Sequence, residues 1–147
     1  LSNQVIAILK KVKIFTGNGE YVFAGNRADK PMSNNTMLYA LKRLGYHKTM
    51  TVHGFRAIAA TALREESQFK YEVRTRNKAG IEETVMANKY TDEHIEIQLG
   101  HLSGTESQRA YDSARYISDR ARMLREWANY LDALKNGTTN VPPLRST

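Results

Sequence analysis

Two residues three positions apart, His53 and Arg56, form the first pair in this sequence that could act together on a substrate. On one helix, that spacing places both side chains on the same face, about one turn apart. A guanidinium offers a planar set of donors to phosphate oxygens, and an imidazole can donate or exchange a proton near neutral pH. Taken alone, such a pair is more often an ordinary surface pair than a functional site.

A second histidine and a tyrosine follow further along the chain. His101 comes directly after Gly100, at a place where a histidine often only donates to the last carbonyls of a helix. Tyr111 comes ten residues later, and a single tyrosine on a helix usually serves packing. These two residues and the earlier pair become a candidate site only through their order along the chain.

The composition is that of a basic globular chain of 147 residues, the size of one domain. Lysine and arginine number 22 against 15 aspartates and glutamates, and the formal net charge of +7 favours a polyanionic partner, most often nucleic acid. The absence of cysteine excludes a disulfide scaffold, a cysteine-based zinc site and a cysteine nucleophile. No apolar run is long enough to cross a bilayer, and we expect no secretory leader.

The elements that must position these residues are predicted to be mainly helical. Apolar residues at helical spacing predict a first helix capped by Ser2. A second helix is predicted to be capped by Ser33 and ended by Gly45. A third helix over residues 52–66, with Thr51 as its cap, would carry the first histidine–arginine pair at its start.

Residues 69–90 have a different pattern from the helices. Apolar or β-branched side chains alternate with charged ones from Phe69 to Arg76, which is the period of a strand. A turn signal over residues 77–80 allows residues 81–86 to return as a second strand. This pattern predicts a hairpin, with a mobile loop as the alternative.

The remaining sequence again favours helices. Thr91 is predicted to begin a helix that Gly100 ends, and a short helix is predicted over residues 108–115. A long final helix is predicted over residues 118–134, because its apolar residues form one stripe. Two prolines and few apolar anchors predict a flexible tail over residues 138–147.

In this order, the motifs resemble the catalytic domain of the tyrosine recombinases, or phage integrases. The segment Thr-Val-His-Gly-Phe-Arg-Ala over residues 51–57 resembles the second active-site box of integrases of the satellite-prophage and genomic-island group. Three other segments are similar to flanking parts of the same group: 30–33, 120–123 and 127–131. Each motif alone is weak, but their combination is specific and covers nearly the whole chain apart from residues 69–90 and the tail.

The resemblance implies a mainly α fold with a minor β element. Residues 1–137 would form the C-terminal part of an integrase catalytic domain, with residues 69–90 as an insertion or hairpin. The implied function is site-specific integration or excision of a prophage or genomic island. The implied partner is double-stranded DNA, bound by a homotetramer in the bacterial cytoplasm at the nucleoid, with no membrane, metal or cofactor.

The family's catalytic roles carry over to single residues of this sequence. Tyr111 matches the nucleophile that attacks a DNA phosphodiester and forms a 3′-phosphotyrosyl link. Arg56 and His101 match residues that bind the phosphate oxygens, and His53 matches the histidine that manages the tyrosine proton. Tyr116 is the competing nucleophile, but the family's interval from histidine to tyrosine is closer to that of Tyr111.

Two departures from the family pattern stand out. The family's first arginine and its strand lysine lie upstream of the segment that resembles residues 1–13. The chain, which begins at Leu1 within a helical pattern, is therefore expected to be a fragment with little or no activity alone. The interval between the second and third boxes is also longer than in relatives. His47 and His94 match no family position and are expected to be surface residues.

Three other functions remain open. The chain could be a non-catalytic, DNA-binding remnant of a decayed integrase. It could belong to a type IB topoisomerase, which uses the same chemistry without a specific site, although the flanking segments disfavour this. A phosphate-binding module unrelated to DNA is the third, and an interaction insensitive to salt would support it.

Overall fold

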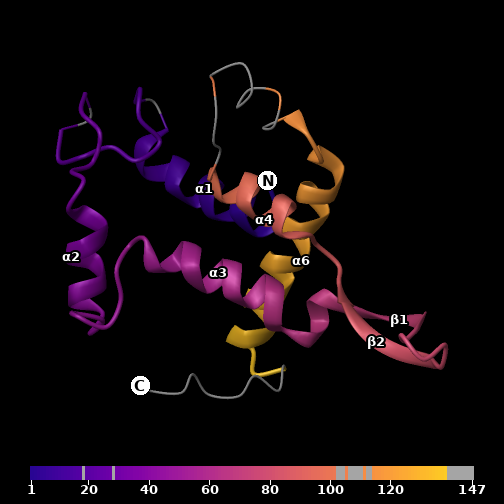
Figure 1. Ribbon diagram of the computed structural model, residues 1–147. Helices are drawn as coiled ribbons and strands as arrows, with labels where there is room; N and C mark the ends of the chain where they lie inside the picture. Colours follow the sequence, from indigo (N-terminus) through magenta and orange to yellow (C-terminus); the bar gives the residue numbers. More distant parts are fainter. Residues whose placement is uncertain (18, 28, 102–104, 106–110, 112–113, 139–147) are drawn as a thin grey trace. The chain divides into compact units, whose positions relative to one another are not determined.

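The computed structural model describes residues 1–17, 19–27, 29–101, 105, 111 and 114–138. The described residues form helices and one two-stranded sheet, so the predicted mainly α fold with a minor β element is confirmed (Figure 1). The chain divides into two compact units, Leu1–Ser33 with Ala121–Thr147, and Asn34–Arg120. No helix of the described residues is both long and apolar enough to cross a membrane.

The first unit is built on two helices, α1 (Asn3–Thr16) and most of α6 (Ile117–Lys135). Ser2 caps α1 as predicted, because its Oγ accepts from the Val5 amide at 3.4 Å. The Gln4 amide donates to Asn129 and Asp132 on α6, at 2.9 Å in each case. These contacts join segments at opposite ends of the chain.

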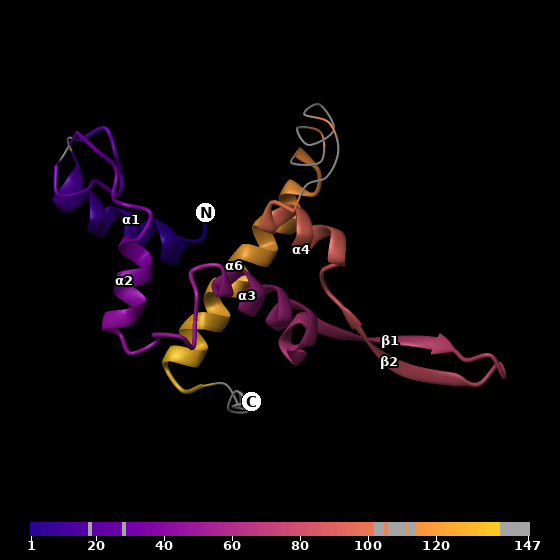
Figure 2. The same ribbon diagram turned by 60° about the vertical axis from the view of Figure 1, so that its left-hand side comes forward.

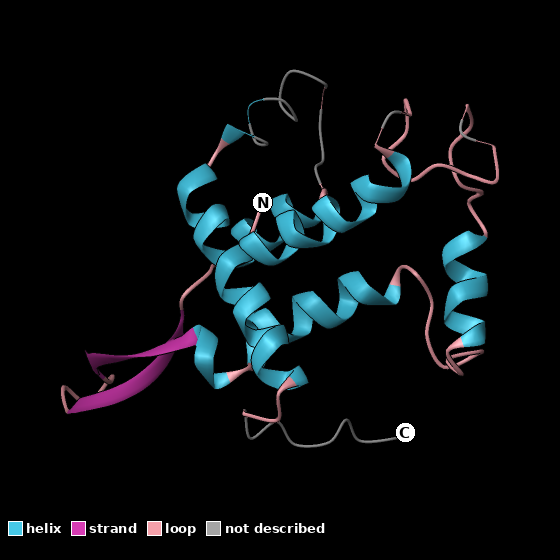
Figure 3. Cartoon of the chain, turned by 180° about the vertical axis from the view of Figure 1, so that it is seen from behind, coloured by secondary structure: helices cyan, strands magenta, loops and turns pink. Residues whose placement is uncertain are grey.

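The second unit contains the other elements. They are α2 (Thr36–Arg43), α3 (Gly54–Glu65), the short 3-10 helix η1 (Ser67–Phe69), β1 (Lys70–Arg76), β2 (Glu82–Asn88) and α4 (Asp92–Leu99). Figure 3 separates the helices from the strands by colour. The most deeply buried side chains of this unit are apolar or aromatic: Leu63, Phe69, Tyr90 and Ile95.

Two helix starts differ from their prediction. Ser33 does not occupy the N-cap position of α2, because residues 34 and 35 form a turn first and Asn35 stands at that position, where its side chain makes no capping hydrogen bond. α3 begins at Gly54 and not at residue 52. The Thr51 hydroxyl does accept from the Gly54 amide at 3.1 Å, but it closes a turn before the helix, so His53 occupies the N-cap position.

The predicted ends of α2 and α4 and the predicted start of α4 are confirmed. Gly45 ends α2 with a φ of +88°, and Gly100 ends α4 with a φ of +75°, both in the left-handed region that favours glycine. The hydroxyl of Thr91 accepts from the His94 amide at 3.3 Å and caps α4. The helix predicted over residues 108–115 and the tail over 138–147 lie mostly outside the described residues.

β1 and β2 form the predicted hairpin, paired antiparallel with Val73 opposite Val85. Asn77 closes the turn, because its Oδ1 accepts from the amides of Ala79 and Ile81 at 3.0 and 3.1 Å. In Figures 1 and 2 the ribbon extends away from α3 and α4. Most of its side chains are accordingly exposed.

Candidate active site

The packing of α3 on α4 positions most of the predicted site. Ala60 and Leu63 on α3 are buried, as are Ile95 and Ile97 on α4. Burying apolar side chains is the main favourable contribution to such a contact, at about 25 cal/mol per Å². The start of α3, with its histidine–arginine pair, is thereby held within the same unit as the turn that follows α4.

Arg56 reaches across from α3 to the end of α4. Its Nη1 donates to the carbonyl of Leu99, the last residue of that helix. A Cβ added to Gly100 would lie 3.8 Å from the same Nη1, so the guanidinium rests directly against this turn. The contact joins residues 43 positions apart and places Arg56 beside the residue that precedes His101.

His101 is held by the helix it follows. Its backbone amide donates to the Glu96 carbonyl at 3.0 Å, and its Nδ1 lies 2.6 Å from the Glu96 Oε2. The imidazole is about half exposed, with 48% of the side-chain surface open to solvent. Among the described residues, Glu96 alone forms a hydrogen bond with the ring, through Nδ1.

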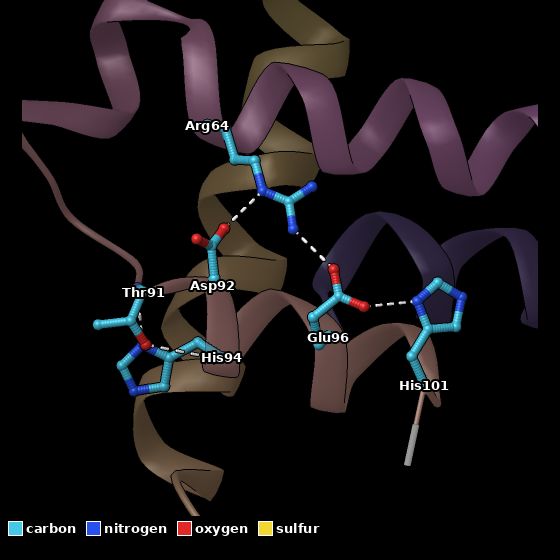
Figure 4. A network of polar contacts seen from close by, with 6 residues as sticks. All are labelled: Arg64, Thr91, Asp92, His94, Glu96 and His101. Atoms are coloured by element: carbon cyan, nitrogen blue, oxygen red, sulfur yellow. Dashed lines mark hydrogen bonds and ion pairs between the residues drawn. The ribbon is translucent and has the colours of Figure 1, made fainter. Parts of the chain in front are cut away.

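Glu96 belongs to a network of polar contacts between α3 and α4 (Figure 4). The Arg64 guanidinium donates from Nη2 to the Glu96 Oε1 at 2.7 Å and from Nε to the Asp92 Oδ1 at 2.6 Å. The hydrogen bond from His101, followed by that from Arg64, holds the pKa of Glu96 below its ordinary value of 4.5. Glu96 is therefore ionised at neutral pH.

Sequence reasoning missed both Arg64 and Glu96. Glu96 lies five residues before His101, a spacing that allows a contact back over the end of a helix. Arg64 gave no such signal, because its two partners lie 28 and 32 residues away and meet it only once α3 packs on α4.

His53 lies at the N-cap position of α3 with an exposed side chain. Its carbonyl accepts from the Arg56 amide at 3.0 Å, so the two residues share the first turn of the helix. Convergence of its imidazole with Arg56 and His101 on one phosphate, within roughly 10 Å of one another, remains a prediction.

Tyr111 is described, but its immediate neighbours on both sides are not. The residue is 68% exposed, and the Arg115 guanidinium carbon lies 5.8 Å from the ring centroid. No contact between described residues joins Tyr111 to Arg56 or His101. The nucleophile assignment therefore remains a prediction from sequence.

Tyr116 has a packing role. Its hydroxyl donates to Glu93 at 3.0 Å and accepts from Arg115 at 2.6 Å. Its ring meets His94 edge-on, with 4.5 Å between the ring centroids. Tyr116, the competing tyrosine, is thereby packed against Glu93 and His94 of α4, and its hydroxyl is already hydrogen-bonded.

His94, expected to be a surface residue, is partly exposed and has a local structural role. Its side chain is half-buried, and its Nδ1 accepts from the Thr91 amide at 3.0 Å. With the Thr91 hydroxyl bonded to the His94 amide, this forms a reciprocal capping box in which a histidine takes the place usually held by Glu or Gln. The physical reason is that the free amides at the start of α4 need acceptors.

The described residues include no group of three or more His, Asp or Glu side chains that could hold a metal ion. What the arrangement of α3 and α4 offers is a set of donors. The guanidinium of Arg56 and the outer edge of His101 flank one glycine turn, and both residue types suit a phosphate oxyanion.

Several known proteins align with nearly the whole chain. The prophage integrase IntA of Escherichia coli K12 is 30% identical over 139 residues, which cover 94% of this chain. The integrase of Shigella phage Sf6 is 30% identical over 90% of the chain, and that of Enterobacteria phage P4 is 30% identical over all of it. The chain belongs to the phage integrase family.

This membership confirms the resemblance inferred from the order of the motifs. The chain spans 28–30% of the length of these three integrases. No family profile and no solved structure matches it. Assignment of individual catalytic residues to this chain therefore rests on motif order together with the geometry of the second unit.

Proposed function

We propose that this integrase chain is the C-terminal part of a catalytic domain of the tyrosine recombinase type. Residues 1–137 would belong to that domain, with residues 69–90 as an insertion between its second and third active-site boxes. One observation carries the proposal: Arg56 contacts the carbonyl of Leu99, beside His101. Two residues of the predicted site that are far apart in sequence are thereby brought to one turn.

The reaction would be a transesterification at a DNA phosphodiester. The Oη of Tyr111 attacks phosphorus, a phosphotyrosyl bond forms on the 3′ side, and the bond to the 5′ oxygen breaks. The proton of Tyr111 passes to His53. The departing 5′ oxygen takes a proton from a general acid, a role that the family resemblance gives to a lysine outside these 147 residues.

Arg56 and His101 would bind the non-bridging phosphate oxygens. Charge on these oxygens changes in the transition state, so donors fixed beforehand contribute more there than in the ground state. Arg56 uses one of its five N–H donors on Leu99 and keeps the others for the phosphate. The contact with Leu99 would hold the guanidinium beside His101.

For the whole protein, we propose site-specific integration and excision of a prophage or genomic island. It would act on double-stranded DNA as a homotetramer, in the bacterial cytoplasm at the nucleoid. The relatives named as integrases and the net charge of +7 support this role.

A nicked suicide DNA substrate tests the proposal, because cleavage releases a short strand that cannot rejoin. The whole protein should form a covalent adduct on its attachment site, and peptide mapping should find the DNA on Tyr111. Tyr116→Phe is the matched control and should still form the adduct.

Three results would contradict this assignment in different ways. An adduct that persists in Tyr111→Phe rejects the nucleophile. Absence of any adduct favours a non-catalytic DNA-binding remnant. Equal cleavage of unrelated duplexes favours a topoisomerase.

A further inference from the structure

The two ring nitrogens of His101 lie in different surroundings. Nδ1 is 2.6 Å from the Glu96 Oε2, whereas no hydrogen bond joins Nε2 to another described residue. A histidine that serves a phosphate must present a defined nitrogen to it, because the two nitrogens point in different directions and only one is within reach.

We propose that Glu96, itself held by Arg64, is a positioning residue that directs the Nε2 of His101 toward the scissile phosphate. The proposal rests on the proposed function for the role of the phosphate. The contact between Glu96 and His101 does not depend on the proposed function.

The chemistry of the carboxylate decides which nitrogen carries a proton. An ionised carboxylate can only accept, so the Nδ1 that faces Glu96 must carry a hydrogen. The lowered pKa of Glu96 agrees with an ionised group at neutral pH. A protonated imidazole then has its second N–H on Nε2, where it can donate to a phosphate oxygen.

Arg64 fixes the carboxylate in turn. Each oxygen of Glu96 has its own partner, with Arg64 on Oε1 at 2.7 Å and His101 on Oε2 at 2.6 Å. Rotation of the carboxylate would break both contacts. The Arg64 side chain is only 30% exposed and is also held by Asp92, so its position is set by two acidic residues of α4. A buttressed carboxylate orients a histidine more firmly than a free one.

The competing explanation is that Glu96 and His101 merely fasten the end of α4. That role predicts a loss of stability on substitution but no specific effect on the imidazole proton. A readout of the tautomer therefore separates the two explanations. We choose nitrogen NMR of the whole protein, labelled with 15N only at histidine, at a pH where the rings are neutral. The His101 signal is assigned by its loss in His101→Gln.

In the neutral ring, the native protein should show the single proton of His101 on Nδ1. The second N–H, on Nε2, is then gained when the imidazolium forms, and this is the form that donates to a phosphate oxygen. Glu96→Ala should give a mixture of both tautomers, because the acceptor that selects one is gone. Arg64→Met keeps the apolar stem but loses the guanidinium, and should produce a partial shift in the same direction. Glu93→Gln removes a carboxylate from the same helix without touching His101, and should leave the tautomer unchanged.

Cleavage of the suicide substrate then tests whether this orientation matters to the reaction. Glu96→Ala should slow single-turnover cleavage by about 10-fold to 100-fold, the size seen when other histidine-orienting partners are removed. Affinity for uncleaved DNA should change less than twofold. Glu96→Gln should recover part of the rate, because its amide oxygen can still accept from Nδ1.

Two results would overturn the positioning role of Glu96 alone. The first is an unchanged His101 tautomer in Glu96→Ala. The second is normal cleavage by Glu96→Ala while His101→Ala cleaves slowly. Normal cleavage by His101→Ala would overturn the catalytic role of the histidine itself and with it this proposal. The NMR result would still report whether Glu96 selects the tautomer, so the two failures are distinguishable.

Discussion

At the scale of single residues, Arg56 connects sequence and geometry most directly. A guanidinium that is bonded to the last carbonyl of α4 is both a helix C-terminal cap and a prepositioned donor. The two roles differ in what a substitution should do. Loss of a cap lowers stability, whereas loss of a transition-state donor lowers the cleavage rate at constant stability.

Arg56→Ala in the whole protein should slow cleavage of the suicide substrate by roughly 100-fold or more, as expected for loss of one preorganised donor to a transition-state oxyanion. Arg56→Lys should recover only part of the rate, because a compact ammonium lacks the planar donor geometry with which a guanidinium can bond the Leu99 carbonyl and a phosphate at once. Cleavage rates at saturating enzyme measure this. Near-native cleavage by Arg56→Ala would mean that the second box has been misassigned.

The pKa of Glu96 leads to a prediction about acid sensitivity. A carboxyl group whose pKa is lower in the folded state than in the unfolded state contributes stability above its unfolded pKa, and that contribution is lost as pH falls. The ordinary value is 4.5, and the hydrogen bonds from His101 and Arg64 lower it. Glu96→Gln should therefore reduce the melting temperature near pH 7, and the difference from the native protein should shrink as the pH falls below the ordinary pKa of 4.5. A difference independent of pH would contradict this origin.

At the scale of elements, the sequence predicted what short-range signals control. Ser2, Thr91, Gly45 and Gly100 act as predicted because each needs only its own turn. Ser33 failed because a turn intervenes before α2, and a single sequence does not distinguish a turn from a first helical turn. The ion pairs of Arg64 on α3 with Asp92 and Glu96 on α4 could not be predicted, since they depend on how the two helices pack.

The capping box of α4 can be tested by substitution. Thr91→Ala removes the hydroxyl that accepts from the His94 amide and should lower the free energy of unfolding by about 0.5–2 kcal/mol. Thr61→Ala is the matched control, because Thr61 is exposed within α3, where alanine is the better helix former. Urea unfolding of both variants should give shifts of opposite sign. Equal shifts in the two variants would show that the Thr91 hydroxyl does not stabilise α4 as a cap.

At the scale of the whole molecule, the hairpin divides into a buried base and an exposed ribbon. Phe69 and Tyr90, which flank the two strands, are each only 1% exposed. Along the strands themselves, Tyr71 is 51% exposed and Met86 is 54% exposed. The folding of the second unit should therefore depend on the base and not on the ribbon, as expected for an insertion between two active-site boxes.

Replacing residues 72–86 by Asn-Gly should shorten the ribbon and leave the rest of the second unit folded. Tyr71 and Ala87 are paired in the sheet, so a two-residue turn can connect them. The free energy of unfolding should change by less than about 1 kcal/mol, because a two-stranded ribbon with little burial adds little stability. Phe69→Ala, at the base, should instead cost about 3–5 kcal/mol. Urea unfolding compares the two variants. A shortened protein as unstable as Phe69→Ala would show that residues 72–86 belong to the folding core, and the insertion assignment would then be wrong.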